Sequence, residues 1–297
     1  MTIYNQINSN KRKTWMIFFL FILIFTGFFF LIGKFLDNTV PYGILGFVIA
    51  IASSIGSYFY SDKLVLAQTH ARPATKEEFF DLYTVTENLS IANGMPMPKV
   101  YVIDDPAPNA FATGRDPKHG VVVATTGILQ RLDRAELEGV IAHELSHIKN
   151  YDILVATITA VLVGTLAMVS DFVMRSLWWG GDDDDNRSKS PIMLVLLIVV
   201  LVITPIVATL IQLAVSRKRE YLADASGALL TRYPEGLARA LEKIAHDPTP
   251  SHSATTSTAQ LFIANPFKKG SGIQNWLTNL FSTHPPIEKR VEILRNM

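Results

Sequence analysis

The segment LDRAELEGVIAHELSH, residues 132–147, decides how this chain is organised. Asp133 is followed three residues later by Glu136, which is the pattern of a capping box and predicts that a helix begins here. Apolar side chains then recur at helical spacing, which places them on one face of that helix: Leu137, Ile141, Leu145 and Ile148. We therefore expect a helix that packs one face into a core and keeps polar residues on the neighbouring face.

The neighbouring face carries His143, Glu144 and His147. Two histidines four residues apart on a helix can point ring nitrogens at one ion about 2.0 to 2.1 Å away, and the glutamate between them reaches a water on that ion. The chain has no cysteine, so histidine and carboxylate side chains must hold any metal. The pattern predicts one zinc ion per subunit, with Glu144 as the general base. The alternative, a solvated helix face, leaves unexplained why the motif lies just before a long apolar stretch.

A catalytic zinc site needs three protein ligands, and the residues directly after His147 do not supply a third histidine. The segment RKREYLAD, residues 217–224, follows the last apolar stretch and places Glu220 and Asp224 on one helix face. An antiparallel pair of membrane spans separates the two segments, so His147 and Glu220 are expected at the same membrane face. We predict Glu220 as the third zinc ligand. Without the motif, it would be taken for an ordinary surface glutamate.

The composition indicates a membrane protein. Of 297 residues, 49% are hydrophobic and 18% charged, and the mean hydropathy is +0.25. The net charge of +1 provides no basic surface field, so a nucleic-acid partner is not expected. Four stretches approach the ~20 apolar residues that cross a ~30 Å hydrocarbon core. They are Thr14–Gly33, Val40–Tyr60, Ile153–Met174 and Ile192–Val215.

Basic residues near the span ends lie on one side of the membrane, which the positive-inside rule makes the cytoplasmic side. They are Lys11, Arg12, Lys13, Lys149, Arg217, Lys218 and Arg219. Both termini and the two water-soluble blocks are then cytoplasmic.

Short elements can be placed in both blocks. In the first block, valine-rich runs predict strands at Lys99–Ile103 and Gly120–Ala124, joined by a loop over Asp104–His119. In the second block, helical spacing predicts two helices followed by a mobile loop that is rich in Ser, Thr, Pro and Gly. These segments are Arg217–Leu230, Pro234–His246 and the loop Asp247–Ile273.

Several motifs, in one order along the chain, resemble those of the HtpX-type family of membrane zinc metalloproteases, and through it the prenyl-protein endopeptidases of the gluzincin clan. They are NAFATG at 109–114, HELSH at 143–147, REYLAD at 219–224 and THPP at 283–286, together with the paired spans. The resemblance implies a zinc endopeptidase of the bacterial inner membrane that degrades misfolded or damaged membrane proteins during stress. Its implied partners are those substrates and the lipid bilayer.

The implied fold is a mainly α membrane protein in which four transmembrane helices carry a gluzincin-like α+β protease domain, with a small sheet, on the cytoplasmic side. Residues 1–60 form a two-span anchor, and residues 61–152 form the first part of the protease domain with the metal motif. Residues 153–215 form a second transmembrane hairpin, and residues 216–297 form the second part of the domain with the third ligand.

The resemblance also implies a role for individual residues. His143, His147 and Glu220 are the zinc ligands, Glu144 is the general base, His284 stabilises the oxyanion, and Asp224 orients the ligand helix by pairing with Arg290. Without the resemblance, a histidine before two prolines is typical of a turn, and an aspartate–arginine pair is typical of a surface.

A substrate held extended across the zinc needs a strand edge to pair with. Either Asn109–Gly114, with Asn109 as a substrate-binding residue, or Gly120–Ala124 can supply that edge. The opposing interpretation is that Val121–Val123 is simply a buried strand, and the sequence leaves this choice open. No run of residues builds a charged specificity pocket, so side-chain selectivity is expected to be weak.

Two other classes of function can be weighed. A transporter or channel places ionisable residues near the bilayer midplane. The first, second and fourth predicted spans contain none, and the third contains only Asp171, near its far end. A catalytically inactive scaffold is the other alternative, and the intact Glu144 argues against it.

Overall fold

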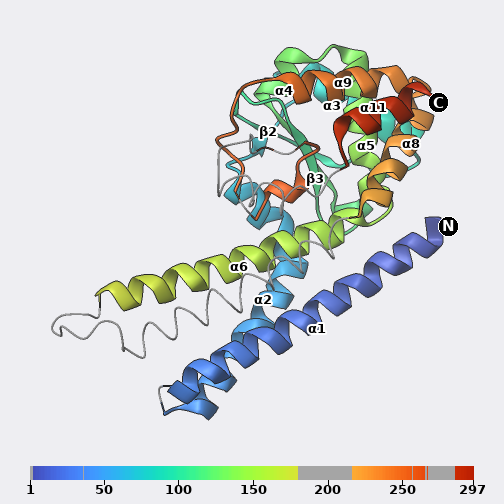
Figure 1. Cartoon of the computed structure of the whole chain (residues 1–297). Helices are drawn as coiled ribbons and strands as arrows, with labels where there is room; N and C mark the ends of the chain where they lie inside the picture. The colour runs from blue at the N-terminus through green and yellow to red at the C-terminus, as the bar shows by residue number, and fades with distance from the viewer. Residues whose placement is uncertain (1–2, 36, 180–215, 256, 265, 267–284) are drawn as a thin grey trace.

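The computed structural model of the chain describes residues 3–35, 37–179, 216–255, 257–264, 266 and 285–297. Three long helices extend from a compact mixed domain (Figure 1). They are α1 (Ile3–Phe35), α2 (Thr39–Gln68) and α6 (Asp152–Trp179). Each contains a segment that is long and apolar enough to cross a membrane, namely Ile7–Lys34, Thr39–Gln68 and Asp152–Val169. These match the first three predicted spans; the fourth, Ile192–Val215, lies outside the described residues.

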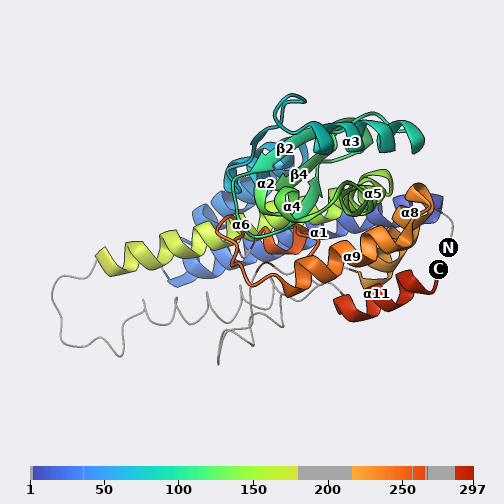
Figure 2. The same cartoon turned by 90° about the horizontal axis from the view of Figure 1, so that it is seen from above.

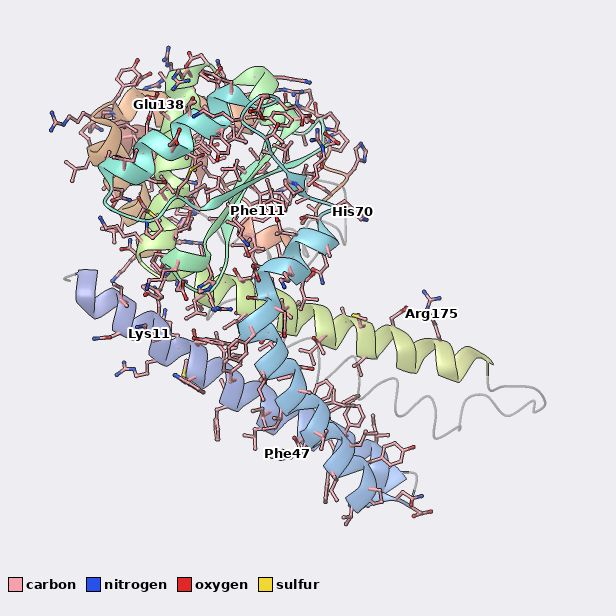
Figure 3. All side chains as sticks on the ribbon, turned by 180° about the vertical axis from the view of Figure 1, so that it is seen from behind. Lys11, Phe47, His70, Phe111, Glu138 and Arg175 are labelled. Carbon is pink, nitrogen blue, oxygen red and sulfur yellow. The ribbon has the colours of Figure 1, made fainter. Side chains whose placement is uncertain are left out.

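Aromatic stacking and one glycine explain how α1 and α2 pack. Phe25 of α1 stacks between Phe21 and Phe29, with ring centroids 5.2 and 5.0 Å away. Gly46 of α2 lies against this row, where a Cβ atom would come within 2.4 Å of the Phe29 side chain. On the outer surface of the helix pair, large apolar side chains such as Phe47 are exposed (Figure 3). A bilayer would cover such a surface, so these helices are candidate membrane helices.

The domain contains a four-stranded sheet of order β1-β2-β4-β3. The strands are β1 (Arg72–Pro73), β2 (Lys99–Ile103), β3 (Ala110–Thr113) and β4 (Val121–Thr125). β2 and β4 are parallel, whereas β1 pairs with β2 and β3 pairs with β4 in antiparallel fashion. The sheet is therefore mixed, and the two predicted strands are confirmed.

The segment predicted as a loop over Asp104–His119 also contains β3 and a short 3-10 helix at Pro117–His119. β3 forms because Phe111 is fully buried and pairs with Val123 of β4. The proposal that Gly120–Ala124 offers an edge to substrate is wrong, because β4 is hydrogen-bonded to strands on both sides. β3 is the edge strand on that side of the sheet.

α5 (Arg134–Lys149) lies at the centre of the domain, where it packs against the sheet and against helices α3 (Phe80–Ala92), α8 (Arg217–Thr231) and α9 (Pro234–His246) (Figure 2). The domain also contains α4 (Thr126–Arg131) and α11 (Ile287–Arg295). The two helices predicted after residue 216 are thereby confirmed as α8 and α9. α5 and α9 approach closely at Gly139, where a Cβ atom would lie 2.6 Å from the backbone nitrogen of Leu237.

The prediction of a mobile loop over Asp247–Ile273 is wrong for residues 257–264. This segment contains a 3-10 helix at Ala259–Leu261 and is buried. Phe262 packs against Phe111 with ring centroids 4.9 Å apart, and the Ile263 N–H donates to the Ala110 carbonyl at 2.9 Å. The apolar run Leu261–Ala264 drives this packing despite the polar residues around it. Residues 265 and 267–273 lie outside the described part of the chain.

Candidate metal centre

The helix that carries the motif begins with the predicted capping box. The Glu136 N–H donates to the Asp133 carboxylate at 2.9 Å, and the Asp133 N–H donates to the Glu136 carboxylate at 2.9 Å. From this start α5 runs between the sheet and helices α8 and α9, so most of its residues are buried. His143 and Glu144 are 1% and 2% exposed. The polar face predicted from the sequence therefore points into the protein.

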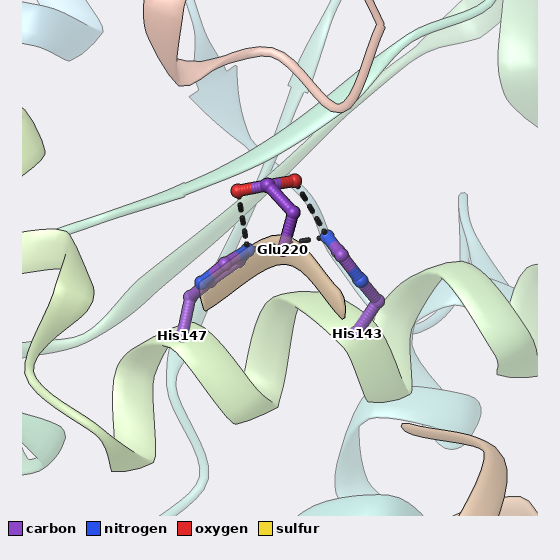
Figure 4. Close-up of side chains that lie close together, drawn as sticks. All are labelled: His143, His147 and Glu220. Carbon is purple, nitrogen blue, oxygen red and sulfur yellow. Dashed lines mark hydrogen bonds and ion pairs between the residues drawn. The ribbon is translucent and has the colours of Figure 1, made fainter. Parts of the chain in front are cut away.

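α8 brings Glu220 between the two histidines (Figure 4). The Glu220 Oε1 atom lies 3.5 Å from His147 Nε2, and its Oε2 atom lies 3.8 Å from His143 Nε2. The two Nε2 atoms are 3.1 Å apart. Gly227 permits this approach of α8 to α5, because a Cβ atom there would come within 3.1 Å of the His143 backbone nitrogen.

The three side chains fit a zinc ion in both chemistry and spacing. Two imidazoles and a carboxylate are the donor set of many catalytic zinc sites. Ligand atoms about 2.0 to 2.2 Å from a tetrahedral zinc lie about 3.4 Å from one another, which is close to the separations among His143, His147 and Glu220. In the described part of the chain, these are the residues whose donor atoms converge within 4.8 Å. They form the zinc site.

Each histidine uses its other ring nitrogen to contact a carboxylate. His143 Nδ1 lies 2.9 Å from Asp224 Oδ1, and His147 Nδ1 lies 3.1 Å from Asp152 Oδ2. A ring that donates its Nδ1–H in this way keeps the Nε2 lone pair for a metal. Burial lowers the pKa of His143 to about 4. Burial acts in the same direction on His147, but the hydrogen bond to Asp152 and the charge of Glu220 raise its pKa to about 9. A histidine binds metal in its neutral form, so these carboxylate contacts hold both rings with Nε2 directed at the site.

The predicted contact between Asp224 and Arg290 is present, and it is buried rather than at a surface. Arg290 donates from Nε and Nη2 to the Asp224 carboxylate at 2.8 and 2.7 Å. Arg290 is 0% exposed. Burial tends to raise the pKa of Asp224, but Arg290 and His143 hold it well below its usual range. α11 thereby fixes the carboxylate that contacts His143.

Glu144 lies beside the ligands with a pKa raised to about 7, mainly because burial disfavours the charged form. The Ala112 backbone of β3 donates a hydrogen bond to its carboxylate. A cavity of about 50 Å³ opens next to these groups, lined by residues that include Ala112, Glu144, His147, Gln260 and Ile263. A carboxyl group that titrates near neutral pH beside a metal site has the properties of a general base.

Two of the predicted site residues stand apart. The Asn109 side chain donates to the Ala264 carbonyl at 3.0 Å and accepts from the Ala110 N–H at 3.1 Å, so it joins β3 to the buried segment 257–264. Its contact with substrate stays a prediction. His284 lies outside the described residues, directly before Pro285.

The sequence interpretation missed Asp152 and Gln260, which both line the cavity. Asp152 stands five positions after His147, and an acid near a ligand histidine is a signal that could have identified it. Gln260 lies in the segment taken for a mobile loop, and its sequence context carries no comparable signal.

A comparison with protein families matches residues 76–297 to peptidase family M48. A curated relative described as a protease HtpX homolog, from Dictyoglomus thermophilum, is 49% identical over 298 residues, covering 100% of this chain and 95% of the relative. A protein of the same description from Tropheryma whipplei is 46% identical over 294 residues, covering 99% of this chain and 98% of the relative. Among solved structures, S. mikatae Ste24p aligns with 94% of this chain and 62% of its own chain, with 18% identity and a TM-score of 0.48.

Proposed function

The chain belongs to peptidase family M48 as a membrane zinc metallopeptidase, and we propose that it is an endopeptidase of the cell inner membrane that cleaves misfolded or damaged membrane proteins during stress. The proposal further places four transmembrane helices in the chain, with a gluzincin-like protease domain on the cytoplasmic side. The domain division at residues 60, 152 and 215 is part of the same proposal.

One observation carries the proposal: the zinc site adjoins the start of a candidate membrane helix. Asp152, which contacts His147, is the first residue of α6 and of its apolar segment Asp152–Val169. The middle of that segment is about nine residues, or about 13 Å, further along the helix. Half of a bilayer's hydrocarbon core is about 15 Å thick. The site would therefore lie near one surface of the membrane, where both water and unfolded segments of membrane proteins can reach it.

The reaction follows from the groups around the cavity. A zinc ion held by His143, His147 and Glu220 supplies Lewis acidity for peptide hydrolysis. Glu144 takes the proton of the attacking water and passes it to the leaving amine, and its burial, which raises its pKa, favours its acting as a proton carrier. His284 is proposed to stabilise the oxyanion, which gathers negative charge as the carbonyl is attacked. Asp224, itself held by Arg290, keeps the His143 ring in orientation.

The proposed substrate lies extended along β3, the edge strand next to Glu144. The carbonyl of Ala110 is already occupied by the Ile263 N–H, and the Ala112 N–H donates to Glu144, so substrate pairing is expected from the Ala112 carbonyl onward. Asn109 would shape this edge by holding Ala264 in place. Backbone pairing does not depend on sequence, which suits an enzyme that acts on many unfolded chains.

Proteolysis of a membrane protein in two folding states tests the substrate class. The purified full chain, reconstituted with zinc in proteoliposomes, is expected to cleave a membrane protein that carries a destabilising substitution in one span, and to leave its stable parent intact. The Glu144→Gln variant is the control for contaminating proteases. Equal cleavage of both forms, or cleavage of soluble unfolded chains only, would contradict the proposed quality-control role while leaving the zinc peptidase activity in place.

Thiol labelling tests the orientation, because the chain has no cysteine. We expect an impermeant reagent to label Ser188→Cys in intact cells and to label Lys99→Cys only after the membrane is opened. Lys99 is an exposed residue at the start of β2, whereas Ser61, directly after the second predicted span, is buried and would label poorly. Labelling of Lys99→Cys in intact cells would place the protease domain on the outer side.

A further inference from the structure

Four helices meet beside His147 in a cluster of polar side chains. We call this cluster the junction, and it consists of Asn10 from α1, His147 from α5, Asp152 from α6 and Arg219 from α8. Asn10 and Asp152 are 2% and 6% exposed. The junction therefore places charged and amide groups where water has little access, and such groups need partners within the protein.

Both oxygens of Asp152 are used. Its Oδ2 atom contacts His147 Nδ1 at 3.1 Å. Its Oδ1 atom accepts from Asn10 Nδ2 at 2.8 Å and from Arg219 Nη1 at 3.2 Å. The same Arg219 nitrogen donates to Asn10 Oδ1 at 3.1 Å, which closes a triangle of three side chains. The carboxylate is thus held on one side while it contacts the ligand histidine on the other.

Asn10 also fixes the backbone between the ligand helix and α6. Its Nδ2 atom donates to the Asn150 carbonyl at 3.0 Å, in addition to Asp152. Asn10 lies one turn before Thr14, where the first predicted membrane span begins. A small displacement of α1 would therefore break contacts that hold Asp152, because a hydrogen bond weakens steeply beyond about 3.2 Å.

An acidic residue in the first turn of α6 has an ordinary structural explanation, since it complements the helix dipole. That role is satisfied at an exposed helix end and needs no ring partner. The burial of Asp152, its contact with a metal ligand, and its two donors from α1 and α8 go beyond it.

We propose that Asp152 is a positioning residue for the zinc ligand His147, and that Asn10 makes the first membrane helix part of the metal site. In this arrangement α1 does more than anchor the chain, because its placement sets the orientation of a zinc ligand. The adjacent position of Arg219 and Glu220 on α8 ties the third ligand to the same junction. The inference rests on the zinc site and is independent of the proposed substrates.

Zinc retention in the full chain, in detergent micelles, tests the inference without measuring activity. Loss of zinc to a chelator is followed for Asp152→Asn, Asn10→Leu and the double variant. We expect Asp152→Asn to bind zinc about 10- to 100-fold more weakly, as is usual when the outer partner of a ligand histidine is lost. Asn10→Leu is expected to weaken it about three- to tenfold, the size of one or two lost hydrogen bonds. The double variant should bind zinc more tightly than the sum of the two single effects predicts, since Asn10 acts in part through Asp152.

Thr14→Val is the matched control, because Thr14 is buried on the same helix and its hydroxyl donates to the Asn10 backbone carbonyl at 3.0 Å and, among the described residues, to no side chain of the junction. It should retain zinc as the parent does. The absorption spectrum of the cobalt-substituted protein should change in Asn10→Leu and stay unchanged in Thr14→Val, a difference that a general loss of stability would not produce. The inference is overturned if Asn10→Leu matches Thr14→Val in both measurements, or if the effects of Asn10→Leu and Asp152→Asn simply add. Should Asp152→Asn fail to fold, the comparison of Asn10→Leu with Thr14→Val decides the question.

Discussion

Replacing Arg290 by methionine is expected to destabilise the folded chain by about 3 to 5 kcal/mol, because the Asp224 carboxylate is left buried without its cation. Arg290 is 0% exposed and donates two short hydrogen bonds to that carboxylate. Folded proteins typically have only about 5 to 15 kcal/mol of stability, so this loss is large. Each kcal/mol lowers the melting temperature by roughly 2 to 4 °C in proteins of similar size, which gives a decrease of roughly 6 to 20 °C. Calorimetry of the purified chain in detergent measures it.

Arg295→Met is the matched control. Arg295 lies on the same helix and contacts Glu235 and Glu242 at 3.1 and 2.9 Å, but its side chain is 45% exposed. Exposed ion pairs contribute little, so this variant should melt close to the parent. If Arg290→Met and Arg295→Met melted at the same temperature, the argument from the buried pair would be refuted.

The double variant Asp224→Leu with Arg290→Met separates stability from zinc binding. It removes both buried charges, and apolar replacements of a buried ion pair are often neutral or stabilising. Most of the lost melting temperature should therefore return. Its zinc affinity should nevertheless be lower than that of the parent protein, because His143 no longer has the acceptor that contacts its Nδ1 atom. Recovery of both properties would mean that Asp224 does not orient His143.

Three further outcomes are expected. Glu144→Gln should retain one zinc per chain, measured by atomic absorption, and lose roughly 10²- to 10⁴-fold in peptide hydrolysis, because an amide cannot accept the proton of water; loss of zinc as well would make Glu144 structural. Glu220→Ala should lose most of its zinc on dialysis, since two histidines form an incomplete site, and tight stoichiometric zinc would exclude Glu220 as a ligand. Burial tends to raise the pKa of Asp105, but hydrogen bonds from residues 251–253 hold it below its usual range. The hydrogen bonds to the ionised carboxylate therefore stabilise the fold fully above the unfolded pKa of about 3.9, and this stabilisation is lost as pH falls through the lower folded pKa. Asp105→Asn should increase proteolytic nicking near residue 251 at neutral pH, and an unchanged digestion pattern would count against the role of Asp105.

The features that the sequence predicted correctly depend on local spacing. The capping box at Asp133 and the face shared by His143 and His147 follow from residues three and four positions apart, a distance fixed by helix geometry. Glu220 is further away, but the predicted antiparallel pair of membrane spans limited where it could lie. These signals remain valid whatever surrounds the helix, and they identified the zinc ligands.

The features that were missed depend on partners distant in sequence. β3 is only four residues long, and it forms because Phe111 is covered by Phe262 from another part of the chain. For the same reason, the segment 257–264 is buried although its neighbours have the composition of a loop. Whether a strand such as β4 is central or at an edge depends on the order of strands in the sheet, which spacing along one strand does not specify.

The contact of Asp152 with His147 has a different origin, because it depends on a break between two helices at one left-handed residue. In an uninterrupted helix, residues five apart lie about 140° from each other around the axis, so their side chains point in different directions. α5 instead ends at Lys149, Tyr151 takes a left-handed conformation with φ of 59°, and α6 restarts at Asp152. This conformation costs roughly 1 to 2 kcal/mol in a residue other than glycine and persists only where the surroundings require it. Here the surrounding contacts include those of Asn10 with Asn150 and Asp152, on either side of Tyr151. In a continuous helix Asp152 would point away from the metal site. Because the helix breaks at Tyr151, Asp152 instead becomes the first residue of α6 and contacts a zinc ligand.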